Sequence, residues 1–358
     1  MFAEPLPTRC PYTFRDMDPA ATESPYVDPQ EYPLPEGWQN SGVITFAMAG
    51  ARTSGKSVYM AIVVKLLKHL CIEYGGAFDY ANDATRESYH VNYEAPLFGL
   101  NGESRRVLGA TRPAESPEAY QHRPLIFRLG RHTLANGTTQ NIFVVFRDVA
   151  GEDLEAMDFE SRMPYLDFFQ HVDSVIYLYD PLAVPEIRDL LAGSVPMDAV
   201  STAEPVAVLK NVVRAIGPHR PEIALTLAKF DIMQEIPRLN LSSTAAISSD
   251  SIDWKQVMDN LGAAFRRAGS RYAKPYDAAD AELLHQETHS MLLNLRAREM
   301  FNVLNQPILG IEPHDYRCYV VSSLGASPTG EHIDDSGIAP FRLLDPLRAQ
   351  FNKLGLFQ

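Results

Sequence analysis

Residues 43–57 read VITFAMAGARTSGKS, an apolar run that leads into a loop of glycine and small polar residues. Just beyond it, apolar residues recur four positions apart at Val58, Ile62, Leu66 and Leu70, which is the spacing of an amphipathic helix. Strand, loop and helix in this order are what a P-loop requires, and residues 50–57 match its pattern. The stretch therefore predicts a phosphate-binding loop between a buried strand and a helix.

The predicted loop supplies groups for a nucleoside triphosphate and for its metal ion. Its backbone N–H groups and the helix N-terminus together form a concave anion site. Lys56 adds a charge for the β- and γ-phosphates, and the Ser57 hydroxyl is a Mg²⁺ ligand. The candidate phosphate-binding residues are Gly50, Arg52, Thr53, Ser54, Gly55, Lys56, Ser57 and Val58.

Composition narrows the classes of protein to consider. The chain has 358 residues, 46% of them apolar and 22% charged, which suits one large globular domain with insertions or two domains. Its net charge of −13 argues against nucleic acid and against an anionic membrane surface as partners. No apolar stretch approaches the length of a membrane span. Cys10, Cys71 and Cys318 lack metal-site spacing, so we expect reduced thiols in a cytoplasmic protein.

Apolar runs alternate with longer segments from Gly42 onward, which predicts an α/β fold with helices on both faces of a mostly parallel six-stranded sheet. Asn136-Gly137 between two of these runs predicts a hairpin, and hence one antiparallel edge strand. Residues 1–37 are rich in proline and should form an extended leader that drapes over the domain or stays mobile. The expected strands are 43–49, 124–130, 141–147, 174–180, 223–229 and 317–322, and further helices are expected near 252–271, 279–305 and 341–354.

A second motif follows the strand expected at 141–147. The strand delivers Asp148 to its carboxyl end, the edge at which open α/β sheets bind ligands, and Asp148 can hold Mg²⁺ directly or through water. Gly151 has no side chain, so its N–H can approach the γ-phosphate. The alternative is a strand that ends in an ordinary turn. Thr111 is a candidate for a further Mg²⁺-contacting hydroxyl, and the alternative for it is a surface threonine.

Two later strand ends suggest recognition of a purine base. Asp231 can accept two hydrogen bonds from the N1–H and the 2-amino group of guanine, whereas adenine offers no equivalent donor pair. Failing to pair a buried carboxylate costs about 1–3 kcal/mol. The aliphatic stem of Lys229 would lie over the base, and the backbone N–H groups of Ser323 and Leu324 would meet the guanine O6. Without guanine, Asp231 is only structural.

Together, in this order, the four motifs resemble the guanine-nucleotide-binding domain of P-loop GTPases of the translation-factor and Ras-like (TRAFAC) class, over about residues 42–356. The sequences around Lys56 (residues 55–59) and Asp148 (residues 146–154) are similar to those of bacterial double-GTPase families. Those families are associated with predicted conflict and defence operons. The resemblance implies a Ras-like GTPase domain over residues 38–358, with insertions at about 75–122 and 232–312. It also implies GTP or GDP and Mg²⁺ as cofactors, and a molecular switch acting on a protein effector. An activating protein and a homodimer are compatible with it.

Two residues depart from the pattern of that class. Ala228 stands where Asn or Thr is usual, which predicts a weaker guanine site or one supported by other residues. Glu152 stands where many relatives have a glutamine that orients the attacking water; a carboxylate can orient water but adds negative charge beside the γ-phosphate. The candidate catalytic residues are Lys56, Glu152 and Arg52, of which Arg52 would be an internal arginine finger or a side chain facing solvent or a partner. We expect slow hydrolysis that a partner accelerates.

Two rival functions fit the same phosphate-binding motif. The first rival is an ATP-hydrolysing P-loop protein, and the second is a non-catalytic scaffold that binds nucleotide for stability.

His285 and His289 lie four apart in an expected helix, so both could face one metal ion. No third ligand is evident in the sequence, which favours a surface helix.

Overall fold

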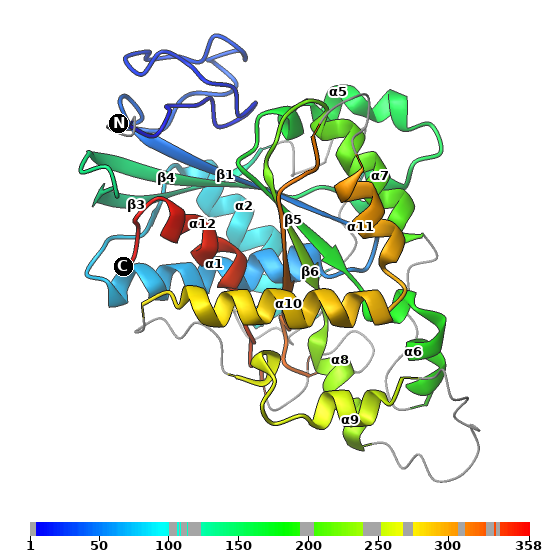
Figure 1. The fold of residues 1–358 in the computed structure, drawn as a ribbon. Coiled ribbons are helices and arrows are strands. Elements are labelled where there is room, and N and C mark those ends of the chain that lie inside the picture. The colour runs from blue at the N-terminus through cyan, green and yellow to red at the C-terminus, as the bar shows by residue number, and fades with distance from the viewer. Residues whose placement is uncertain are drawn as a thin grey trace.

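The computed structural model describes residues 5–99, 106, 108, 113, 123–193, 204–238, 252–267, 275–306, 312–326, 333 and 337–358. These residues contain one seven-stranded sheet in the order β2-β3-β4-β1-β5-β6-β7 (Figure 1). Five strands run parallel, while β3 is antiparallel to β4 and β2 is antiparallel to β3. The strands are β1 (Gly42–Gly50), β2 (Asp79–Tyr80), β3 (Leu125–Thr133), β4 (Thr139–Arg147), β5 (Ser174–Tyr179), β6 (Glu222–Leu227) and β7 (Tyr316–Val320).

All six expected strands are present, and the sheet has one strand more than we expected. The additional strand β2 pairs Asp79 with Arg128 and Tyr80 with Phe127, so β2 is the edge strand, and β3, which runs opposite to the other six strands of this sheet, lies between β2 and β4. A strand of two residues is too short to show the alternation of apolar and polar side chains by which a strand is recognised in a sequence. The predicted hairpin joins β3 to β4, where Gly137 has φ +81° and the Leu134 N–H donates to Thr138 O at 2.9 Å.

Helices cover both faces of the sheet, as the continuous apolar strands require. β1 and β5 are buried along their whole lengths. Phe46 of β1 packs against Phe351 of α12, with ring centroids 6.1 Å apart. Tyr177 of β5 lies beside Ala49 in the register and therefore points to the face opposite Phe46. Its hydroxyl donates to Pro205 O at the start of α7, at 2.6 Å, so α12 and α7 lie on opposite faces (Figure 1).

The α-helices of the described residues vary from one turn to five. None combines the length and the apolar character needed to cross a membrane. They are α1 (Lys56–Glu73), α2 (Asp83–Tyr89), α3 (Ala95–Phe98), α4 (Gly151–Glu155), α5 (Met163–Leu166), α6 (Pro185–Leu190), α7 (Pro205–Ile216), α8 (Phe230–Glu235), α9 (Trp254–Asp259), α10 (Ala278–Asn294), α11 (Arg298–Asn305) and α12 (Asp345–Lys353). A π-helical turn, His90–Glu94, joins α2 to α3, and short 3₁₀ turns lie at 159–162, 167–170, 181–183, 236–238 and 264–266.

Helix α10 lies along the edge strand β7 and supplies a side-chain partner for its backbone. The Cys318 N–H donates to His285 Nδ1 at 2.9 Å, and the ring of His289 lies 4.1 Å from that of Phe301 in α11. These histidines are therefore half-buried on the side of α10 that packs against β7 and α11, while most residues of the helix are exposed or half-buried. The helix expected over 279–305 is in fact two helices, because Arg296 between them has φ +60°. Because α10 covers the edge strand β7, it blocks pairing of that strand with other chains.

The proline-rich N-terminal segment packs onto the edge of the sheet opposite the P-loop. Cys10, Phe14 and Trp38 are fully buried, and the Trp38 indole donates to Arg9 O at 2.9 Å. Arg9 forms an ion pair at 2.5 Å with Asp173, the residue before β5. These contacts join residues 5–41 to the starts of the central strands.

All three cysteines lie in the described part of the chain, and each is buried and outside any disulfide. Burial raises the pKa of the Cys71 thiol to about 12 and also raises that of Cys318. Thiols with raised pKa values stay protonated at neutral pH and react slowly.

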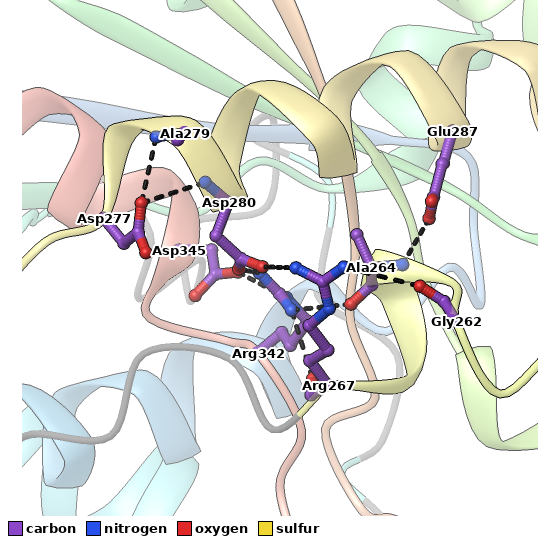
Figure 2. A network of polar contacts seen from close by, with 9 residues as sticks. All are labelled: Gly262, Ala264, Arg267, Asp277, Ala279, Asp280, Glu287, Arg342 and Asp345. Carbon is purple, nitrogen blue, oxygen red and sulfur yellow. Dashed lines mark hydrogen bonds and ion pairs between the residues drawn. The ribbon is translucent and has the colours of Figure 1, made fainter.

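A buried arginine ties the segment around 262–280 to the C-terminal part of the chain (Figure 2). The Arg342 guanidinium donates to Asp345 at 2.6 Å and to Asp280 at 3.1 Å. It also donates to the carbonyl oxygens of Ala264 and Arg267, both at 3.1 Å. Arg342 directly follows Phe341, whose backbone forms a bridge with Ser322 at the end of β7. The network therefore ends next to one of the predicted base-binding loops.

Candidate nucleotide-binding site

The topology brings the four predicted motifs to one edge of the sheet. β1, β4, β6 and β7 all run in the same direction, so their carboxyl ends lie at the same edge. Each motif directly follows one of these strands, and Asp180 follows β5 between them. The loops lie at Gly50–Ser57, Asp148–Gly151, Lys229–Asp231 and Ser322–Leu324. This edge is where open α/β sheets bind ligands.

Glycine conformations shape the first loop. Gly50 has φ +140°, and a Cβ there would lie 2.6 Å from Leu178 O, so only glycine fits. Gly55 has φ +92° and precedes α1, and having no side chain it leaves the first-turn N–H groups uncapped. Ser54 is buried, and its hydroxyl oxygen has no hydrogen-bond partner among the described residues. Thr53 is exposed with φ +60°, and Val58 is half-buried in the first turn of α1.

Lys56 and Asp148 are buried charges side by side with Ser57. The Lys56 ammonium donates to the carbonyl oxygens of Gly50 and Ala51, both at 2.8 Å. Burial lowers its pKa to about 8, while the negative charges of Asp148 and Glu155 oppose that shift. Burial also raises the pKa of Asp148, against the opposing effect of Lys56. Both shifts show a site that lacks solvent to stabilise its charges.

The donor set around Asp148 fits a Mg²⁺ ion. The Ser57 hydroxyl donates to Asp148 Oδ2 at 2.7 Å. The other carboxylate oxygen, Oδ1, is buried and has no hydrogen-bond partner in the part of the chain that the structure describes. A buried, unsatisfied carboxylate oxygen is costly unless a cation or water meets it. Mg²⁺ is bound through one or two such oxygens together with phosphates and waters. Thr111, the other predicted metal contact, lies outside the described residues.

Tyr93 also reaches this site, although no motif in the sequence points to it. Its side chain is only 2% exposed, and its hydroxyl lies 3.4 Å from Asp148 Oδ2. Tyr93 belongs to the π-helical turn His90–Glu94, a local widening of the helix that is frequent at functional sites. The neighbouring Tyr89 stacks on it and donates to Ala61 O of α1 at 2.6 Å. The segment after α1 thus contributes a side chain to the predicted metal site.

Helix α4 packs directly on the phosphate loop. A Cβ on Gly151 would lie 2.4 Å from the Arg52 nitrogen, so the two loops touch only because residue 151 is glycine. The Arg52 guanidinium pairs with Glu152 at 2.8 Å, which joins two of the candidate catalytic side chains. In addition, the Arg52 backbone N–H donates to Glu155 Oε1 at 2.5 Å. Glu155 was not among the predicted site residues.

The predicted base-binding residues also lie together. Asp231 is 8% exposed, and its Oδ1 accepts a hydrogen bond of 2.5 Å from the Ser322 hydroxyl. Lys229 has φ +49°, and its ammonium pairs with Asp180 at 2.6 Å, which fixes the direction of its aliphatic stem. Asp180 also caps the turn that follows it by accepting from the Leu182 N–H at 2.9 Å.

The loop after β7 is held by its own hydrogen bonds. Ser322 accepts from the Gly325 N–H at 2.9 Å, and Leu324 O accepts from the Ala339 N–H at 2.8 Å. Ser323 and Leu324 are half-buried in this turn. Ala228 is buried and cannot supply the side-chain bridge that Asn or Thr would give.

The fold and the site define a mixed α/β protein with a glycine-lysine-serine loop at the carboxyl edge of a mostly parallel sheet. No family model matches the chain. It belongs to the family of a Mycolicibacterium smegmatis (strain ATCC 700084 / mc(2)155) protein described as "Putative ESX-1 scaffolding and assembly protein SaeC". The two are 38% identical over 318 residues, which cover 88% of this chain and 76% of that protein.

Among solved structures, a bacterial selenocysteine-specific elongation factor, EF-Sec, matches 87% of this chain. This chain spans only 28% of the elongation-factor chain, at 12% identity and a TM-score of 0.26. A score of that size is too low to support a shared fold.

Proposed function

We propose that this protein binds GTP with Mg²⁺ at the carboxyl edge of its sheet and hydrolyses it slowly, as a Ras-like molecular switch. The observation that carries the proposal is the joint placement of Lys56, Ser57 and Asp148 with a separate loop that holds Asp231 at the same edge. Phosphate groups and a base, at the two ends of one nucleotide, need two such clusters.

Each residue of the phosphate cluster has a role in this proposal. The N–H groups of Gly50–Ser57 and the Lys56 ammonium would bind the β- and γ-phosphates. Mg²⁺, when bound, would neutralise charge that develops on the phosphates during hydrolysis. Ser57 and Asp148 would hold it, and Gly151 would donate its N–H to the γ-phosphate. Glu152 would orient water, but its pairing with Arg52 and its negative charge both favour a slow reaction.

The base cluster makes guanine the preferred purine. Asp231 is buried and anchored by Ser322, so it presents a fixed carboxylate to the two donors of guanine. Ser322 therefore holds the Asp231 carboxylate by a hydrogen bond, which the apolar side chain of Ala228 cannot do. A purine without those donors would leave the carboxylate unpaired, at a cost of about 1–3 kcal/mol.

Affinity for GTP and ATP, measured side by side in Mg²⁺, tests the proposal. We expect tighter binding of GTP, and we expect Asp231→Asn to lose that preference by about tenfold or more. Asp253→Asn is the matched control, because the Asp253 side chain caps α9 by accepting from the Gln256 N–H. Tighter binding of ATP by the wild type, or an unchanged preference in Asp231→Asn, would favour the ATP-hydrolysing rival.

A second function, the non-catalytic scaffold, is favoured by the name of the relative, which speaks of scaffolding and assembly. We propose that the effector belongs to an assembly process of that kind, with nucleotide stabilising the scaffold. Here GTP should raise the melting temperature of the wild type but not of Lys56→Ala. Phosphate release is the deciding measurement, since steady release abolished by Lys56→Ala supports a switch, and its absence supports a scaffold. The defence setting, the cytoplasmic location and a homodimer stay predictions.

A further inference from the structure

Helix α4 presents two carboxylates to one residue of the phosphate loop. Glu152 pairs with the Arg52 side chain at 2.8 Å, and Glu155 accepts from the Arg52 backbone N–H at 2.5 Å. The contact of Gly151 with Arg52 sets α4 against the loop, and Asn211 of α7 donates to Leu154 O at 2.9 Å. Glu155 is thus held where an anion would otherwise meet the loop.

The position of this contact relates it to the third phosphate of a nucleotide. Backbone N–H groups of the loop are the groups that bind phosphate oxygens. Arg52 touches Gly151, the residue whose N–H we assign to the γ-phosphate. Glu155 also acts electrostatically on Lys56, the cation of the same site. A γ-phosphate and the Glu155 carboxylate would therefore compete for the same donor and for the same positive charge.

We propose that Glu155 is a specificity residue that sets the preference between nucleoside diphosphate and triphosphate. Its carboxylate takes a position on the loop that a γ-phosphate needs and that a diphosphate leaves free. A triphosphate must displace it, whereas a diphosphate binds with the contact intact. This inference rests on the proposed nucleotide site.

Two variants of the full chain separate charge from contact. Glu155→Gln keeps an oxygen that can accept from the Arg52 N–H but removes the negative charge, and Glu155→Ala removes both. Glu160→Gln is the matched control. Glu160 lies only a few residues after Glu155, is exposed, and pairs with Arg214. Affinities for GDP and GTP are measured in Mg²⁺ at fixed ionic strength, by competition with a fluorescent guanine nucleotide.

We expect the ratio of GTP affinity to GDP affinity to rise about tenfold in Glu155→Ala, from the loss of a charge-assisted contact, and by a smaller factor in Glu155→Gln. The ratio should stay unchanged in Glu160→Gln. Equal ratios in the wild type and both Glu155 variants, with both nucleotides bound, would overturn the role of Glu155 and leave the proposed function intact. If no variant and no wild-type protein binds either nucleotide, the proposed function fails and this inference fails with it.

Discussion

Lys56 is a charge that the fold buries at a cost. Its ammonium has two carbonyl oxygens and a nearby carboxylate as partners, yet burial still lowers its pKa to about 8. A phosphate group would return the missing negative charge and remove that penalty. In the absence of nucleotide, the cost should be visible as a dependence of stability on pH.

Between pH 8 and the ordinary lysine value of 10.5, the folded chain has lost the Lys56 proton while the unfolded chain keeps it. The free energy of unfolding should therefore rise with pH in this window, by up to about 1.4 kcal/mol per pH unit from this group. Below pH 8 the penalty is present in full. Urea unfolding of the wild type and of Lys56→Met, at several pH values without nucleotide, checks this. A constant difference between the two proteins would contradict it.

The Tyr93 hydroxyl donates to the carboxylate of the predicted metal site, so its removal should weaken Mg²⁺ binding. Removing its hydroxyl in Tyr93→Phe takes one donor from Asp148 Oδ2 and leaves the ring packed. We expect nucleotide binding to need about two- to fivefold more Mg²⁺, the effect of one long hydrogen bond. A Mg²⁺ titration of nucleotide affinity measures it. Tyr89→Phe is the control, since its hydroxyl contacts α1 and not Asp148. Equal Mg²⁺ requirements in all three proteins would exclude a role for Tyr93.

The sequence could indicate Lys56, Ser57 and Asp148 because local spacing on strand ends determines where they lie. Tyr93 and Glu155 had no such signal. Tyr93 reaches the site only through a π-helical turn, and Glu155 only because α4 packs on the loop across Gly151. Contacts of this kind depend on the packing of segments far apart in the chain, which spacing alone does not show.

At the scale of elements, the strands were easier to predict than what connects them. Continuous apolar runs in β1, β4, β5 and β6 mark buried parallel strands. The sequence predicts the helices of the later insertion only roughly: the first expected helix is the short α9 and a 3₁₀ turn, and the second is broken at Arg296. Their ends are set by contacts with the rest of the molecule, such as those of Arg342.

Arg342 is the residue through which several elements depend on one another. Its side chain is 2% exposed, so Arg342→Ala would remove the hydrogen bonds that Asp345 and two carbonyl oxygens accept from it (Figure 2). We expect a loss of about 3–5 kcal/mol in the free energy of unfolding. Arg267→Ala is the control, because Arg267 pairs with the same Asp280 while 50% exposed, and should cost less than about 1 kcal/mol. Denaturant unfolding compares them, and similar losses in both would argue against the network.

In the whole molecule, different segments pack at the two ends of the parallel strands. One carries the candidate nucleotide loops, and the other carries the N-terminal segment. Composition alone marked that segment as proline-rich, but the positions of Trp38 and Phe14 in the core follow from the tertiary contacts they make. Their burial makes the segment part of the folded unit and not only a covering.

Replacing Trp38 tests how far stability depends on the N-terminal segment. Trp38 is fully buried, and its ring centroid lies 4.6 Å from that of Phe143. Trp38→Ala should lower the free energy of unfolding by about 3–5 kcal/mol. The chain has two tryptophans, so Trp254→Phe leaves Trp38 as the single fluorescent reporter of this packing. A loss below about 1 kcal/mol in Trp38→Ala would mean that the segment adds little to stability.

The buried cysteines have a practical consequence. Cys10 lies in the N-terminal segment, Cys71 in α1 and Cys318 in the edge strand, so each one samples a different region. A small alkylating reagent can modify each thiol only when its surroundings open transiently. The order in which the three peptides gain mass therefore ranks these regions by how easily they open, with no foreign probe added to the chain.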